Sequence, residues 1–209
     1  MQRHLSASTL ALLIAPPLFW AGNAVVARAL VGVFPPLALS FARWALALLI
    51  VLPFTLRGLR ESWPSLRGCW AVVIAISALG VGCYNSLQYL ALQTSTAVNA
   101  TLIGASAPIA SLLVGAAFFG AVVRRVQWLG AALSLLGVLL VIARGDPMNI
   151  AQLHLARGDL IMLVATLSWS VYTWLLRTRR PAMPAAPFLT LQIALGAFVK
   201  EDSPELDVK

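Results

Sequence analysis

The feature that most constrains this chain is a series of seven apolar segments, six of them long enough to cross a lipid bilayer. About 20 helical residues cross roughly 30 Å of hydrocarbon, and the first six segments contain 18 to 24 residues each. The pattern predicts an all-α membrane protein, a multi-span helical bundle. We place the segments at 9–30, 36–56, 68–91, 97–120, 126–143, 159–176 and 187–199.

The composition excludes a soluble domain and makes the lipid bilayer the first expected partner. The chain is 60% hydrophobic and only 11% charged, whereas a soluble domain carries roughly 25% charged residues. The net charge of +8 does not indicate a nucleic-acid partner. The basic residues lie in short runs between apolar segments, and no basic face with interleaved aromatic residues is found.

The distribution of arginines between the loops predicts the orientation in the membrane. Alternate loops, starting with the N-terminus, hold nine arginines, and the other loops before the tail hold three. Because positive loops stay in the cytoplasm, we predict a multi-pass protein of the inner (plasma) membrane with a cytoplasmic N-terminus. The first group is Arg3, Arg57, Arg60, Arg67, Arg124, Arg125, Arg177, Arg179 and Arg180, and the second is Arg28, Arg144 and Arg157.

Two segments share a phrase, which indicates a duplicated unit. "LFWAGNAVVAR" begins at Leu18 and "LSWSVYTWLLR" at Leu167, so that Trp20 corresponds to Trp169. The unit would contain five helices, and an odd number inserts the second copy upside down. Inverted repeats share a site near the bilayer midplane. We therefore divide the chain into a first repeat (1–145), the start of a second repeat (146–199) and a charged tail (200–209) that is not part of the fold.

These segments resemble the EamA-like transporters of the drug/metabolite transporter superfamily. The resemblance covers about residues 8–198 and rests on "LFWAGNAVVAR", "FPPLALSFARWALALL", "YLALQTSTAVNATLIGASAPIASLLVGAAFFG", "WLGAALSLLGVLLV" and the text from Gly158 to Arg177, in that order. It implies ten helices in two inverted repeats, of which about seven are present. We accordingly expect a C-terminally truncated form that is unstable or oligomerises, and that transports nothing alone. Ala121 follows Gly120 where family members often have Glu, so no role is assigned there.

Polar side chains inside spans are costly in lipid and mark candidate substrate contacts. Arg43 lies eight residues into the second span, where it must either snorkel outward or face a cavity. Tyr84, Asn85, Gln88 and Tyr89 form the densest cluster, and their i,i+4 spacing predicts one polar-aromatic stripe that lines a cavity; the alternative is hydrogen bonding between helices. The further candidates are Trp20 and Asn23 in the first span, Asn99 and Ser106 in the fourth, and Trp169, Tyr172 and Gln192 in the second repeat.

Acidic residues do not occur deep in any span, and Asp159 at a span end is the nearest. The two histidines, His4 and His154, are terminal or loop residues, so we expect no catalytic set, metal site or cofactor. The leading hypothesis is a carrier of small metabolites, amino-acid-like or related, that works by alternating access. The alternatives are a non-transporting membrane fragment or partner protein, with homo-oligomers possible, and a membrane enzyme acting on lipid-linked substrates.

Overall fold

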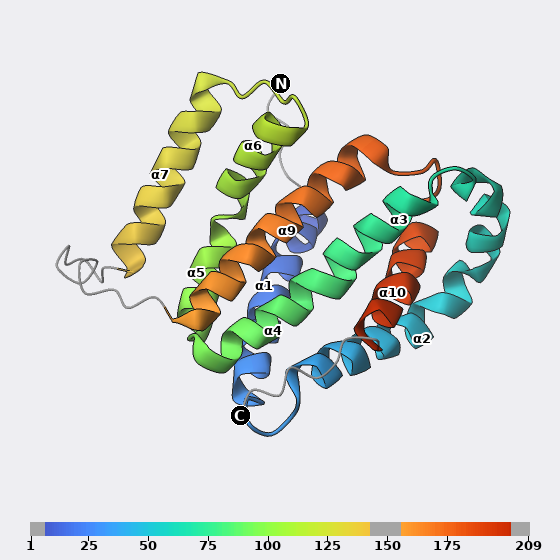
Figure 1. The fold of residues 1–209 in the computed structure, drawn as a ribbon, viewed down its shortest axis with the longest axis horizontal. Helices are drawn as coiled ribbons and strands as arrows, with labels where there is room; N and C mark the ends of the chain where they lie inside the picture. Colours follow the sequence, from blue (N-terminus) through green and yellow to red (C-terminus); the bar gives the residue numbers. More distant parts are fainter. Residues whose placement is uncertain (1–6, 143–155, 202–209) are drawn as a thin grey trace.

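Each apolar segment forms helix in the computed structural model, which describes residues 7–142 and 156–201 (Figure 1). The described residues contain helices, turns and bends, which confirms the predicted helical membrane bundle. The elements are α1 (Ala7–Ala29), α2 (Pro36–Ser62), the 3-10 helix η1 (Trp63–Leu66), α3 (Trp70–Ser77), the π-helical turn η2 (Ala78–Cys83), α4 (Tyr84–Thr94), α5 (Ala97–Ala105), α6 (Ala107–Phe118), α7 (Arg125–Ile142), α9 (Arg157–Arg179) and α10 (Ala185–Glu201).

Four of these helical stretches are long and apolar enough to cross a membrane by themselves. They are Thr9–Ala29, Pro36–Leu66, Trp70–Thr94 and Arg157–Arg179. The pair α5 and α6 meets the same test as one span with a bend of 41°. The apolar part of α10, Ala185–Ala197, is shorter.

The second span is longer than predicted, because α2 continues past residue 56 to Ser62 and then into η1. The sequence placed a polar loop here on account of its charges. Instead, Arg57 and Glu61 form an i,i+4 ion pair of 2.8 Å on an exposed helical turn, and no proline lies between residue 56 and Pro64. The start of α2 agrees with the prediction, since Pro36 is its first residue and proline suits the first helical turn.

The third and fourth spans are irregular in different ways. The third runs without a break through α3, η2 and α4, and π-helical turns of this kind change which residues face a neighbour. The fourth is bent at Ser106, between α5 and α6. Pro108 follows at the start of α6 and has no backbone N–H to give to the preceding turn, which accounts for the bend.

α9 lies at the centre of the arrangement (Figure 1). It packs along α4 and also contacts α6, α5, η2 and α3. On the other side, α10 packs against α2, η2 and α3, and α7 lies at the edge beside α5 and α6. The C-terminal part of the described chain is therefore packed into the helices of the first part.

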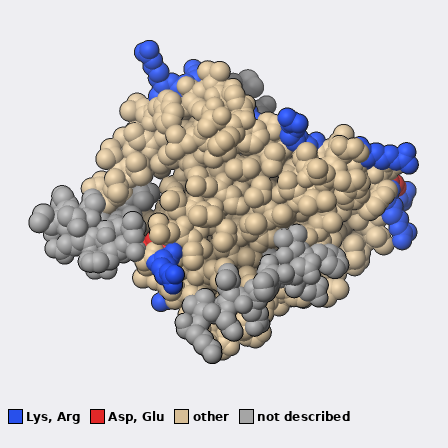
Figure 2. Space-filling model, viewed as in Figure 1, with Lys and Arg blue, Asp and Glu red and all other residues tan. Residues whose placement is uncertain are grey.

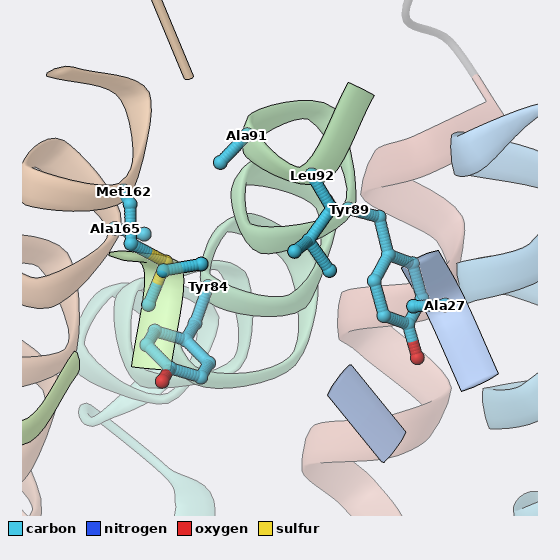
Figure 3. Close-up of a cluster of buried hydrophobic side chains, with 8 residues drawn as sticks. Ala27, Tyr84, Tyr89, Ala91, Leu92, Met162 and Ala165 are labelled. Carbon is cyan, nitrogen blue, oxygen red and sulfur yellow. The ribbon is translucent and has the colours of Figure 1, made fainter. Parts of the chain in front are cut away.

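Two clusters of buried side chains hold these helices together. The first joins α1, α4, α5 and α9, and includes Tyr84, Tyr89, Leu92 and Met162. Figure 3 shows that Tyr84 extends from α4 toward Met162, whereas Tyr89 extends from the other side of α4 toward Ala27. The second joins α10 to α3 and the end of η1, around Phe188.

The exterior is apolar, as expected of a surface in lipid. Many large hydrophobic side chains are more than half exposed, among them Phe54 at 85% and Phe118 at 79%. In the space-filling view, charged side chains lie around the ends of the body and the middle of the visible face carries none (Figure 2). Most of the apolar side chains are therefore not buried inside the protein. Contact with lipid explains why they lie on the surface.

Candidate functional site

A pocket of about 420 Å³ lies between α1, α2, the η2–α4 segment, α9 and α10. Seven of the twelve residues predicted as candidate substrate contacts line it. They are Trp20, Asn23, Arg43, Tyr84, Asn85, Trp169 and Tyr172. The structure thus brings together residues that are up to 152 positions apart, from Trp20 to Tyr172.

One side of the pocket is polar and is built by α2 and α4. Arg43 Nη2 donates a hydrogen bond of 2.8 Å to Asn85 Oδ1, and the guanidinium carbon lies 4.7 Å from the centre of the Trp44 ring. Arg43 therefore faces the pocket and does not snorkel to the membrane surface. Among the described lining residues it is the one charged side chain.

The other side is aromatic and is built mainly by α1 and α9. The two tryptophans of the repeated phrase, Trp20 and Trp169, meet edge to face with their ring centres 5.4 Å apart. Tyr84 lies 4.8 Å from Trp169 and 5.9 Å from Trp20, and Tyr172 lies 4.9 Å from Trp169. Contacts of this length are favourable between aromatic rings, so the four side chains form a connected wall.

Tyr89 supports the pocket from behind. Its hydroxyl donates a hydrogen bond of 2.6 Å to Asn23 Oδ1, and its ring lies 5.9 Å from the Arg43 guanidinium. The side chain is 2% exposed and is absent from the described lining. Tyr89 therefore fixes the positions of Asn23 and Arg43 without bordering the space itself.

The π-helical turn η2 supplies backbone to the pocket through Gly80 and Val81. A Cβ atom at Gly80 would lie 2.5 Å from the Tyr172 ring. Two carbon atoms that are not bonded to each other do not come this close. Glycine is therefore required for α9 to bring Tyr172 this close to the third span. Tyr172 is among the residues predicted from the sequence, whereas Gly80 is not.

Five predicted residues lie outside the lining. Gln88 and Gln192 are buried, at 4% and 3% exposure, and each has a side-chain oxygen with no donor among the described residues. Asn99 belongs to the first turn of α5, where Thr96 caps its backbone N–H, and Ser106 Oγ donates to the Ile103 carbonyl at the bend. The fifth, Tyr89, is the supporting residue described above. The expected single stripe on α4 is thus divided, with Tyr84 and Asn85 at the pocket and Gln88 and Tyr89 beside it.

Sequence reasoning missed Trp44, together with four apolar lining positions in addition to Gly80. A signal for Trp44 was present. It lies well inside a span, as Trp20 and Trp169 do, and it directly follows Arg43. The apolar positions carry no signal in a chain this hydrophobic. They are Pro16, Phe19, Val81 and Leu189.

Asp159, the acidic residue nearest to a span interior, lies in the first turn of α9, as the sequence predicts. Asp159 is 3% exposed, accepts a hydrogen bond from Ser95 Oγ and accepts another from the Ala156 backbone N–H at 3.0 Å. It caps the first turn of α9, where a carboxylate is favoured by the helix dipole. It does not line the pocket.

A group of three or more His, Cys, Asp or Glu side chains able to hold a metal is not found in residues 7–142 and 156–201. The lining offers an arginine, two amides and several aromatic rings. Such a set binds an organic solute by hydrogen bonds and ring contacts.

The sequence comparisons identify the family of this helical bundle. The sequence model of the EamA-like transporter family matches residues 7–143. The chain belongs to the EamA-like transporter family. It is therefore a multi-pass membrane protein of the drug/metabolite transporter superfamily, as the resemblance implied.

Two curated relatives of this EamA-like chain are named as transporters. One, the uncharacterized transporter YyaM of Bacillus subtilis, is 30% identical over 150 residues, or 70% of this chain and 48% of the relative. The other, an uncharacterized transporter of Archaeoglobus fulgidus, is 30% identical over 171 residues, or 81% of this chain and 57% of the relative. The chain thus spans about half the length of both. No solved structure matches it.

Proposed function

We propose that this chain forms the substrate pocket of an integral membrane carrier for small organic metabolites. The pocket between α1, α2, α4 and α9 carries the proposal, because it joins an arginine and two amides to an aromatic wall inside an apolar exterior. The names of the family and of the two relatives support a transporter rather than an enzyme.

The proposed mechanism is alternating access, with the pocket opening in turn to each side of the inner membrane. The supporting observation is that Trp20 and Trp169, the corresponding residues of the two repeats, touch each other at the pocket. A site shared by inverted repeats lies between them, and rocking of one repeat against the other changes its access. The N-terminus is proposed to be cytoplasmic on the basis of the loop arginines.

Counterflow in proteoliposomes tests the proposal. Vesicles loaded with an unlabelled metabolite are placed in the same labelled metabolite, across a panel that includes amino acids and organic acids. Both the chain alone and the chain combined with the part of the Bacillus subtilis relative outside the match are reconstituted. We expect saturable counterflow of at least one compound from the combination and none from the chain alone, because a carrier exchanges solute through one alternating site.

A matched pair of tryptophan variants connects the flux to the pocket. Trp169→Ala removes the centre of the aromatic wall and should lower the counterflow rate about tenfold, the effect of losing roughly 1.4 kcal/mol of ring contacts. Trp128→Ala removes a side chain of α7 that is 44% exposed and should leave the rate unchanged. Absence of counterflow from every preparation, or equal rates in both variants, would contradict the proposal.

A further inference from the structure

We propose that the pocket is selective for monocarboxylates with an aromatic or other apolar body, and that Arg43 and Trp44 bind the carboxylate. This deepens the proposed function and rests on it for the premise that the pocket receives a solute. It is narrower than the amino-acid-like class expected from the sequence, because it excludes molecules that carry an ammonium group.

The first argument is that two residues that line the pocket each have a buried donor without an acceptor among the described residues. Arg43 uses Nη2 for Asn85, but its Nε is buried and has no partner among the described residues. Trp44 Nε1 is likewise buried and unpartnered in the described structure. Buried donors without acceptors are destabilising. A carboxylate offers two acceptor oxygens and a negative charge, which match two donors and one guanidinium.

The second argument is that the charge of the lining is positive and single. Arg43 is the one charged group among the described lining residues. One monoanion therefore neutralises the pocket. A second carboxylate or a phosphate dianion would bring a further charge into a largely apolar space, where an unpaired charge is costly.

The third argument is that the described lining residues carry no counter-charge for an ammonium group. The two amide oxygens at the pocket already accept hydrogen bonds, Asn85 Oδ1 from Arg43 and Asn23 Oδ1 from Tyr89. An amino acid would have to leave its ammonium beside a guanidinium, with no carboxylate among the lining residues that the structure describes. The aromatic wall of Trp20, Tyr84 and Trp169 suits an uncharged ring. Because aromatic faces also attract cations, the exclusion of the ammonium group rests on its repulsion by the Arg43 guanidinium.

Four compounds with the same phenyl ring test the selectivity of the purified chain. They are 3-phenylpropanoate, its neutral amide, phenylalanine and 2-phenylethylamine. Tryptophan fluorescence at the pocket measures their binding in detergent. We expect 3-phenylpropanoate to bind about tenfold or more tightly than the other three, since hydrogen bonds between charged groups are stronger than those to a neutral amide.

Two arginine variants assign the carboxylate site. Arg43→Gln should weaken 3-phenylpropanoate about tenfold and leave the amide unchanged, because only the acid loses a charge partner. The control is Arg177→Gln, since Arg177 also lies over a tryptophan ring, Trp174 at 5.4 Å, but does not line this pocket. It should leave the affinities for all four compounds unchanged.

The four compounds are compared on the unmodified chain, so this test does not depend on whether a variant folds. Binding of phenylalanine or 2-phenylethylamine as tight as that of 3-phenylpropanoate would overturn the inference, and so would saturable binding of none of the four. Counterflow of other solutes, with no preference for carboxylates, would also overturn it while leaving the proposed carrier function intact. Loss of counterflow for every solute would instead contradict the carrier function itself.

Discussion

The hydrogen bond from the Tyr89 hydroxyl to Asn23 joins α4 to α1, as does the one from the Arg28 guanidinium to the Leu92 carbonyl. Replacing Tyr89 with Phe removes the bond to Asn23 and keeps the ring. We expect the free energy of unfolding to fall by about 1 kcal/mol, the typical value of a hydrogen bond between membrane helices. Titration with a denaturing detergent, followed by circular dichroism, measures the change.

Tyr84 provides the matched control for this substitution. It lies on the same helix and is also buried, but its hydroxyl donates no hydrogen bond to any of the described residues. Tyr84→Phe should therefore leave the free energy of unfolding within about 0.5 kcal/mol of the original, as for a change that removes no contact. Equal losses in both variants would mean that the Asn23 bond contributes nothing.

At the scale of single residues, the sequence predicted the chemistry of the site better than its boundary. Arg43, Asn85 and Trp169 could be selected because polar and large aromatic groups are rare and costly inside a span. Gln88 was selected for the same reason, yet it is buried beside the pocket. Whether such a residue meets a cavity or a neighbouring helix depends on helix rotation and packing, which its type and spacing do not specify.

At the scale of helices, α9 comes close to the backbone at the end of α4 at Gly158. A Cβ atom there would lie 2.1 Å from the Ala91 carbonyl oxygen and 2.7 Å from the Ser95 backbone nitrogen. Gly158→Ala therefore forces the helices apart and should lower the free energy of unfolding by about 1–3 kcal/mol, as overpacking does. The same detergent titration measures this loss.

Gly130 of α7 is the control for Gly158. A Cβ atom there meets nothing within 4 Å, and alanine is the better helix former by about 1 kcal/mol. Gly130→Ala should therefore leave stability unchanged or raise it slightly. A similar decrease in both variants would indicate that the α4–α9 contact is not specifically tight.

The helices themselves were predictable to the extent that hydropathy determines them. The segments at 126–143 and 159–176 correspond to α7 and α9 within a few residues, because lipid requires a continuous apolar stretch. The extension of α2 to Ser62 was not predicted, since charged residues can continue a helix beyond the hydrocarbon. The π-helical turn at Ala78–Cys83 was not predicted either, because it depends on how α9 and α10 pack against it.

At the scale of the whole molecule, the orientation that we propose in the membrane rests on nine loop arginines against three. Reporter fusions after Arg60, Arg125 and Arg180 should be active in the cytoplasm, because positive loops are retained there. Fusions after Thr94 and Met148 should be active outside. The reverse pattern would contradict the orientation, and a mixed pattern would contradict the number of crossings.

The pocket is assembled from two stretches of the chain, one inside the family match and one beyond it. The match covers residues 7–143 and so includes Arg43 and Asn85, whereas Trp169 and Tyr172 of α9 lie beyond it. A chimera that took its first 143 residues from one relative and the remainder from another would join one protein's polar side and its Trp20 and Tyr84 positions to a foreign α9, which supplies the Trp169 and Tyr172 positions of the aromatic wall. Solute preference in such hybrids should therefore follow neither parent, and changes on one side of the junction should require compensating changes on the other.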